Sequence, residues 1–288
     1  MILVTGATGR TGQQVVTHLH SSGQAVRILV RPTSVVPRQW DGVERAVGDL
    51  DDAASLHQAM SGVDGLFLLS PMDPELDRFE RNAIDAAVRV GVGHIVKMST
   101  TKPEPDSPIP WWRAHWRAEQ HLRACERPWT ILRPNGIAFF LLDLARGVRE
   151  HGVIPTAAGD GRMALVDPDD IAAVATRVFA DRARYAGVVL DITGPEAVSY
   201  ADVAGILTEL TGRSVSHVDV SVDEGRSALR DGRPEWEVEG LLANWLMTRD
   251  GSGGFDRVTD DVERVTGRRP RELRIFLGAH VDAFRRQA

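Results

Sequence analysis

The chain has 288 residues, of which 43% are hydrophobic, so it can bury a sizeable core as one large domain or as a domain with a smaller lobe. Its net charge of -6 comes without a block of lysines and arginines, so a nucleic acid is not expected as a partner. Cys125 is the one cysteine, which excludes a disulfide within the chain and a thiolate metal cluster.

The single cysteine and the start of the chain favour a reducing cytoplasm. Residues 1–5 already have the pattern of a buried strand, which leaves no space for a signal peptide before it. No apolar run approaches the roughly 20 residues that a helix needs to cross a bilayer. We therefore expect a cytoplasmic protein without a membrane partner.

The first 135 residues alternate short apolar strands with amphipathic helices. Strands are expected over residues 2–5, 25–30, 43–47, 64–69, 94–98 and 129–133. Helices are expected over residues 10–21, 52–60, 75–90 and 111–126. Such an alternation is typical of a parallel sheet covered on both faces, so the sequence predicts an α/β, Rossmann-type doubly wound sheet.

The second half is less regular and predicts a smaller, mixed α/β lobe. Helices are expected over residues 137–150, 169–179, 200–210 and 272–284, with a broadly helical stretch over 223–247. Strands are expected over residues 188–192 and 215–220, and a flexible loop over 251–254. We therefore divide the chain into a dinucleotide-binding domain over 1–136 and a substrate-binding lobe over 137–288, partly interleaved with the sheet.

A glycine-rich loop lies between the first strand and the first helix. Glycines at positions 6, 9 and 12 allow a tight turn, let the backbone approach a pyrophosphate and let the helix pack closely on the strand. Free N–H groups at the start of the helix then receive the phosphates. The pattern predicts cofactor binding, with a structural turn as the alternative. The residues expected to hold the cofactor here are Gly6, Thr8, Gly9, Arg10, Thr11 and Gly12.

The end of the second strand bears on the choice of cofactor. Binders of NAD place an acidic residue there to accept a hydrogen bond from the ribose 2′-OH. This strand instead ends Leu29-Val30-Arg31-Pro32, and the Arg31 guanidinium is well matched to a 2′-phosphate. Arg10 is a second candidate for the same contact, although both arginines also suit a solvated surface. The sequence therefore favours NADP(H), with NAD(H) as the alternative.

Several further motifs complete a family resemblance. They are Val47-Gly48-Asp49-Leu50, Met98-Ser99-Thr100, His115, Glu119, and the runs over residues 129–136 and 266–270. With the glycine loop, they make the sequence resemble the NmrA-like branch of the atypical short-chain dehydrogenase/reductases. That family includes NAD(P)H-dependent quinone reductases and cofactor-binding regulators without turnover. The resemblance implies that Asp49 and Leu50 lie near the adenine, and that Leu69, Ser70, Ser99 and Pro134 lie near the nicotinamide ribose.

One departure from the wider superfamily concerns the proton donor. The superfamily uses a tyrosine with a lysine four residues later, but neither Tyr185 nor Tyr200 has a lysine at that spacing. The only lysines are Lys97 and Lys102. Alcohol dehydrogenation by the usual superfamily mechanism is therefore not expected.

Other residues are candidates for the chemistry. His115 and Glu119 are four residues apart on a predicted helix and share one face, so His115 is a candidate proton donor, with a structural His–Glu pair as the alternative. Ser99 follows a strand at the sheet edge where ligands bind in such folds, and otherwise caps a turn. Aromatic residues near these positions suit an apolar pocket for a flat substrate or, equally, a core. The expected pocket residues are Trp112, Trp116, Asn135, Phe139 and Phe140.

The leading functional hypothesis is an NAD(P)H-dependent oxidoreductase that passes hydride to a quinone or a conjugated carbonyl. One alternative is a non-catalytic NADP(H) sensor that acts through a protein partner. Another is a tailoring enzyme that reduces or rearranges one specialised metabolite. No metal site is expected, because the histidines lack ligand spacing. A small-molecule substrate is the expected partner, and a homodimer is compatible with the sequence.

Overall fold

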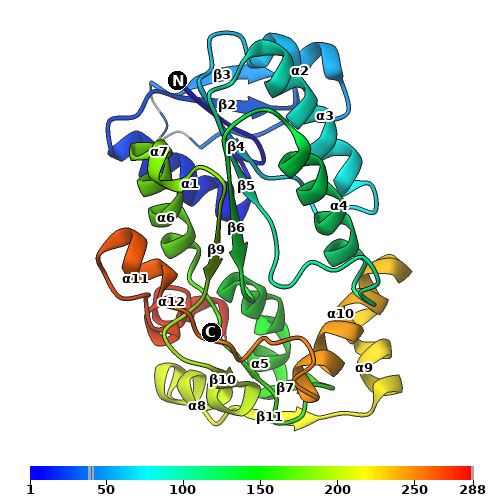
Figure 1. Ribbon diagram of the computed structural model, residues 1–288. Coiled ribbons are helices and arrows are strands. Elements are labelled where there is room, and N and C mark those ends of the chain that lie inside the picture. Colours follow the sequence, from blue (N-terminus) through cyan, green and yellow to red (C-terminus); the bar gives the residue numbers. More distant parts are fainter. Residues whose placement is uncertain (38–39, 41, 287–288) are drawn as a thin grey trace.

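The structure, a computed structural model, describes residues 1–37, 40 and 42–286. Within them, parallel strands form a seven-stranded sheet in the order β3-β2-β1-β4-β5-β6-β9 (Figure 1). The strands are β1 (Ile2–Val4), β2 (Val26–Val30), β3 (Glu44–Val47), β4 (Gly65–Leu68), β5 (His94–Met98), β6 (Trp129–Pro134) and β9 (Val188–Ile192). Strand order reverses between β1 and β4, and such a switch point opens a ligand crevice at the carboxyl ends of the strands. The predicted fold class is confirmed.

Helices cover both faces of this sheet (Figure 1). On one face lie α1 (Arg10–Ser21), α6 (Pro168–Ala180) and α7 (Arg182–Tyr185), and on the other lie α2 (Ala53–Ala59), α3 (Leu76–Val90) and α4 (Pro110–Ala124). Apolar residues fill the space on each side, and all four residues of β4 are buried. The central strands β1 and β4 are therefore apolar along their whole length rather than alternating, as a sheet covered on both faces requires, whereas the edge strand β3 is largely exposed.

The second half of the chain contributes to the sheet. Strand β9 pairs with β6 in parallel, with Leu132 opposite Leu190. Helix α6 packs against α1, and α11 (Asp261–Thr266) packs against α6. Residues beyond 136 therefore complete both the edge of the sheet and the helical layer on one of its faces.

The remaining residues of the second half form a smaller mixed α/β unit at the carboxyl end of the sheet (Figure 1). Strand β7 pairs with β11, and β8 pairs with β10. The elements of this unit are η1 (Ala138–Leu144), α5 (Ala145–His151), β7 (Val153–Thr156), β8 (Arg162–Met163), β10 (Val198–Ser199), α8 (Tyr200–Thr211), β11 (Ser216–Asp219), α9 (Val222–Leu229), α10 (Glu235–Arg249), α12 (Leu273–Ala279) and η2 (Val281–Ala283).

Two helical predictions differ from the structure in this unit. The stretch over 223–247 is two helices, because Gly232 has a φ of +74° and Pro234 caps the start of α10. The expected helix over 137–150 begins as the 3₁₀ helix η1 before it continues as α5. No helix among the described residues is long and apolar enough to cross a membrane.

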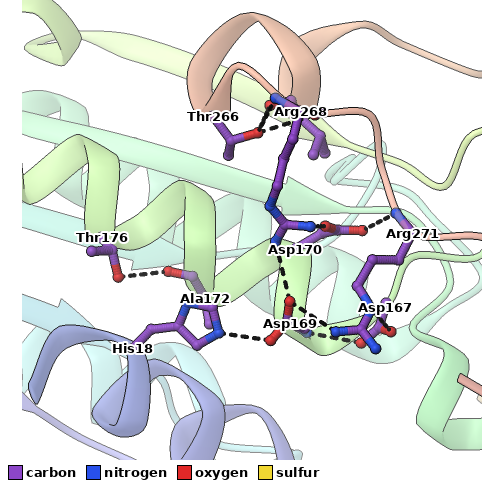
Figure 2. Close-up of polar contacts among 10 residues, drawn as sticks. His18, Asp167, Asp169, Asp170, Ala172, Thr176, Thr266, Arg268 and Arg271 are labelled. Atoms are coloured by element: carbon purple, nitrogen blue, oxygen red, sulfur yellow. Dashed lines mark hydrogen bonds and ion pairs between the residues drawn. The ribbon is translucent and has the colours of Figure 1, made fainter. Parts of the chain in front are cut away.

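An ion-pair cluster attaches the segment after α11 to the start of α6 (Figure 2). Arg268 contacts Asp169 at 3.1 Å and Asp170 at 3.0 Å, while Arg271 contacts Asp167 at 3.0 Å. The backbone N–H of Arg271 also donates to Asp170 at 2.7 Å. These carboxylates lie at the cap and first turn of α6, where negative charge is favourable.

Candidate active site

The glycine loop brings the start of α1 against the end of β1. Gly6 has a φ of +60°, and a Cβ atom there would lie 2.7 Å from the carbonyl oxygen of Leu69. Thr5 fixes the same contact, because its hydroxyl donates to that oxygen at 2.8 Å and accepts from the Leu69 N–H at 2.8 Å. The close approach leaves the loop backbone open to a ligand at the start of α1.

A cavity of about 960 Å³ begins at this loop and extends along the carboxyl ends of the strands. The structure brings nearly all the predicted cofactor residues to its wall. Those that line it are Gly6, Thr8, Gly9, Arg10, Thr11, Arg31, Asp49, Leu50, Leu69, Ser70, Ser99 and Pro134. Gly12 does not line it and instead packs on the loop, because a Cβ atom there would overlap the Gly6 carbonyl oxygen. Gly12 therefore shapes the loop rather than the wall of the cavity.

Two arginines stand at the loop end of the cavity. Arg31 is exposed just after β2, and the Arg31 backbone N–H donates to Ser34 at 3.2 Å. Arg10 reaches across the cavity to η1, where its guanidinium donates to the carbonyl of Phe139 at 3.2 Å and pairs with Asp143 at 3.4 Å. Arg10 therefore links the glycine loop to the second half of the chain.

Farther along the cavity wall from the glycine loop, the Ser99 hydroxyl belongs to a buried network of hydrogen bonds. It donates to the Glu119 carboxylate at 2.7 Å, and Arg133 pairs with both oxygens of that carboxylate at 3.0 and 2.6 Å. Burial alone would raise the pKa of Glu119, but the hydrogen bonds from Arg133 and Ser99 outweigh it and lower that pKa. Because the Ser99 proton is held by a carboxylate, the hydroxyl can only accept toward the cavity, so Ser99 does not fit the part of a proton donor.

The alternative of a structural pair between His115 and Glu119 is wrong, because each side chain has another partner. Both side chains lie on α4, but Glu119 binds Arg133, whereas the His115 ring accepts from Lys97 of β5 at 2.9 Å. Lys97 also forms a fully buried ion pair with Glu80 of α3 at 2.7 Å. Burial, and then the charge of Lys97, hold the pKa of His115 well below its ordinary value. His115 lines the cavity as a neutral ring, so it is not an imidazolium acid.

Aromatic side chains form the far end of the cavity. Trp112 is 1% exposed, and its ring lies 5.5 Å from that of Phe255 in a tilted arrangement. Asn135 is also buried, and its amide donates to the Phe255 carbonyl at 2.6 Å. Phe139 and Phe140 pack together and line the cavity too.

Trp116 is the predicted pocket residue that the structure does not bring to the cavity. The residues of α4 that line it are Trp111, Trp112 and His115. Trp116 directly follows His115 and so points away from it by about 100° around the helix. The α4 face that meets the cavity therefore begins one residue earlier than the Trp112–Trp116 spacing predicts.

The second half supplies an apolar wall that the sequence did not specify. Residues of this wall include Met163, Leu165, Leu229, Leu241, Trp245 and Phe255, with Tyr200, Asn244 and Arg233 as polar members. Lys97 and Glu80 were also missed. The one available signal was a lysine within the otherwise apolar strand His94–Met98, a position where a charge needs a buried partner.

Known proteins resemble this chain in sequence and in structure. A family model described as NAD(P)H-binding matches residues 6–182. A (4-alkanoyl-5-oxo-2,5-dihydrofuran-3-yl)methyl phosphate reductase from Streptomyces griseus is 34% identical over 99% of both chains. Two solved structures are each 27% identical and cover 98% of this chain and 99% of their own. One is the triphenylmethane reductase of Citrobacter, with a TM-score of 0.86, and the other is the Escherichia coli NADPH-dependent quinone oxidoreductase in complex with NADPH, with a TM-score of 0.85.

These matches extend over nearly the whole chain, and the family model covers more than half of it. The family model begins at Gly6, the first glycine of the loop that forms one end of the cavity. The chain therefore belongs to this NAD(P)H-binding family, in the NmrA-like branch of the atypical short-chain dehydrogenase/reductases, and is an NAD(P)H-dependent oxidoreductase.

Proposed function

We propose that the protein uses NADPH to reduce a quinone or a conjugated carbonyl compound without a Tyr–Lys dyad. The observation that carries this proposal is one cavity that runs from the glycine loop, past His115, to an aromatic chamber. A dinucleotide held at the loop would extend along the carboxyl ends of the strands, as in other folds of this class. Its nicotinamide would then face the chamber, where it supplies hydride to the bound acceptor.

The residues along the cavity suit each successive part of the cofactor. The loop offers backbone N–H groups for the pyrophosphate, and Arg31 offers a guanidinium where a binder of NAD would carry an acidic side chain. Asp49 and Leu50 line the same cavity and are proposed to contact the adenine. Leu69, Ser70, Ser99 and Pro134 follow along the wall toward His115 and are proposed to hold the nicotinamide ribose.

The chamber supports a flat, apolar acceptor. Trp111, Trp112 and Phe255 surround it, and a few polar groups, among them His115 and Asn244, interrupt the apolar wall. The relatives agree with this class: one is named for a quinone, and another for an alkanoyl-substituted 5-oxo-2,5-dihydrofuran, whose carbonyl is conjugated. Such acceptors take hydride at a conjugated carbon, and this chemistry does not depend on the tyrosine–lysine pair of the wider superfamily.

The test is NADPH oxidation in the presence of quinones, enones, enals and cationic triarylmethane dyes. We expect turnover with at least one planar conjugated acceptor, and stronger binding of NADPH than of NADH. Tight NADPH binding without oxidation by any acceptor would favour the sensor hypothesis instead. Turnover confined to a single complex metabolite would favour the tailoring enzyme.

A further inference from the structure

Three charged or titratable side chains meet behind the cavity wall. Lys97 comes from β5, Glu80 from α3 and His115 from α4. The side chains of Lys97 and Glu80 are fully buried, whereas that of His115 is 13% exposed and lines the cavity. Ser70, which also lines the cavity, donates to the second oxygen of Glu80 at 3.0 Å. The cluster thus touches the cavity at two points, His115 and Ser70.

The hydrogen bonds of Lys97 determine which ring nitrogen of His115 carries the proton. The Lys97 Nζ lies 3.0 Å from the carbonyl oxygen of Met98, 2.9 Å from His115 Nδ1 and 2.7 Å from Glu80 Oε2. An ammonium group has three N–H bonds for these three acceptors and no acceptor of its own. The Nδ1 atom must therefore accept, and the ring proton of a neutral His115 lies on Nε2.

We propose that His115 donates its Nε2 proton to the oxygen of the bound acceptor and that Lys97 replaces this proton through Nδ1. The inference rests on the proposed function, since it assigns a proton donor to that reaction. His115 is then a catalytic residue, and Lys97 is the positioning residue that sets the tautomer of His115 and supplies a proton to its Nδ1 atom. Together they replace the tyrosine–lysine pair with a histidine from a helix and a lysine from a strand.

Protons and charges balance through this relay. Hydride addition to the acceptor carbon leaves an oxyanion. The Nε2–H bond of His115 breaks as the acceptor O–H bond forms, and a Nζ–H bond of Lys97 breaks as a Nδ1–H bond forms. The ring stays neutral throughout, and the positive charge of Lys97 cancels the negative charge of the oxyanion. The site resets when Nε2 takes a proton from solvent that enters the cavity and the Nδ1 proton returns to Lys97, so that Lys97 is again an ammonium and the ring again carries its proton on Nε2.

The other charged groups near the cluster do not compete for this proton. Glu119 lies close enough to Glu80 and Lys97 for their charges to interact, but it forms a bidentate pair with Arg133. Burial raises the pKa of Glu80, although the charge of Lys97 acts against it. Glu80 stays paired with Lys97, orients its ammonium group and takes no part in the proton transfer.

A first experiment observes the tautomer without any turnover. The ring nitrogens of ¹⁵N-histidine-labelled protein are followed by NMR between pH 5 and pH 8, and His115→Phe assigns the signal. We expect a neutral ring with its proton on Nε2 over this whole range. The double variant Lys97→Met/Glu80→Gln removes the donor without leaving a lone buried carboxylate, and it should free Nδ1 to bind a proton. A proton on Nδ1 in the unchanged protein would overturn the proposal.

A second experiment separates proton donation from a structural role. Single-turnover rates are measured with an enone, whose reduction needs a proton, and with a cationic triarylmethane dye, whose reduction by hydride gives a neutral product without one. His115→Phe and Lys97→Met/Glu80→Gln should each slow enone reduction by about 10²-fold. Reduction of the dye should change by no more than about threefold, since general acid catalysis is the step removed.

A matched control lies on the same helix. His121 pairs with Asp85 and is outside the cavity wall, so His121→Gln should leave both rates unchanged. Equal losses with the enone and the dye in the His115 and Lys97 variants would mean that the cluster only holds the fold, which overturns the relay. Absence of hydride transfer from the unchanged protein to either acceptor would instead overturn the proposed function itself.

Discussion

At the end of β2, Arg31 is the residue on which we expect the choice of cofactor to depend. Arg31→Asp removes a guanidinium that suits a 2′-phosphate and adds a carboxylate that suits a 2′-OH. The ratio of the NADPH and NADH dissociation constants should shift toward NADH by about 2 kcal/mol or more, which is at least about 30-fold. Fluorescence titration with both cofactors measures the shift.

The control for this variant is Arg45→Asp, which makes the same charge change on an exposed position of neighbouring β3. It should alter the ratio of the two constants little, because Arg45 does not line the cavity. Equal affinities for NADPH and NADH in the unchanged protein would show that Arg31 does not bind the 2′-phosphate.

A second prediction concerns the two tyrosines. Tyr200 lines the cavity, but burial raises its pKa to about 12, and the hydroxyl stays protonated throughout the physiological range. Tyr185 packs instead in the core beside the sheet. We therefore expect Tyr200→Phe and Tyr185→Phe to keep the single-turnover rate within about threefold, since neither removes a proton donor worth about 10². A loss of that larger size, with cofactor binding intact, would place a tyrosine at the reacting oxygen.

The residues of the site differ in how far the sequence could predict them. Those on the glycine loop and at strand ends were predictable, because the motif and the parallel sheet determine where that backbone runs. The contact between Lys97 and His115 was not, because it joins two elements whose relative rotation depends on side-chain packing. The same holds for Trp116, since the register of α4 against the cavity follows from that packing.

Among the elements, the junction of the glycine loop with α1 tolerates the least change. Gly12→Ala would place a methyl group onto the Gly6 carbonyl oxygen, so the loop and helix must separate. We expect a loss of about 2 kcal/mol in the free energy of unfolding and at least tenfold weaker NADPH binding. Gly205→Ala is the matched control, because Gly205 is exposed within α8 and a Cβ atom there meets nothing within 4 Å. It should stabilise the protein by about 0.5–1 kcal/mol in urea unfolding.

The first turn of α6 carries a pH-dependent contribution to stability (Figure 2). Asp169 accepts from His18 at 2.7 Å and also contacts Arg268 and Arg271, and these partners hold its pKa below the ordinary value. A lowered carboxylate pKa adds stability above the unfolded pKa of about 3.9, and this is lost as the pH falls toward the folded pKa. Asp169→Asn should therefore cost about 1–2 kcal/mol at pH 7, since the cluster is only partly buried.

The difference in the free energy of unfolding between Asp169→Asn and the unchanged protein should become smaller when urea unfolding is repeated below about pH 4. Asp256→Asn, at an exposed position of the loop after α10, is the control and should have little effect at either pH. An equal difference in the free energy of unfolding at pH 7 and pH 3.5 would show that Asp169 stabilises the helix by hydrogen bonding alone, without its charge.

Element ends were predictable where local signals are strong. The expected helix over 10–21 and the strands over 94–98 and 188–192 match α1, β5 and β9 residue for residue. The short strands β8 and β10 were missed, because two residues form a strand only when a distant partner lies beside them. The break between α9 and α10 was missed too, although Gly232 and Pro234 mark it.

At the scale of the whole molecule, the cavity joins two structural units with different tasks. The first half supplies a wall of strand ends and loop backbone, which is set by the fold of the sheet. The second half supplies side chains from α9, α10 and the loop up to Phe255. Cofactor affinity and acceptor affinity should therefore respond to different mutations, even though one cavity holds both ligands.

Trp112 tests this division, because it lies on α4 of the first half while its ring packs on Phe255 of the second. Trp112→Ala should raise the KM for a planar acceptor at least tenfold, about 1.4 kcal/mol, since a large apolar contact surface is lost. The NADPH dissociation constant should stay within about twofold, and Trp112→Phe should give an intermediate KM. Trp129→Ala is the control: it removes a tryptophan at the opposite end of the sheet, so thermal stability should fall without a change in acceptor KM. Weakening of NADPH and acceptor binding by the same factor in Trp112→Ala would mean that the tryptophan supports the whole cavity rather than its acceptor end.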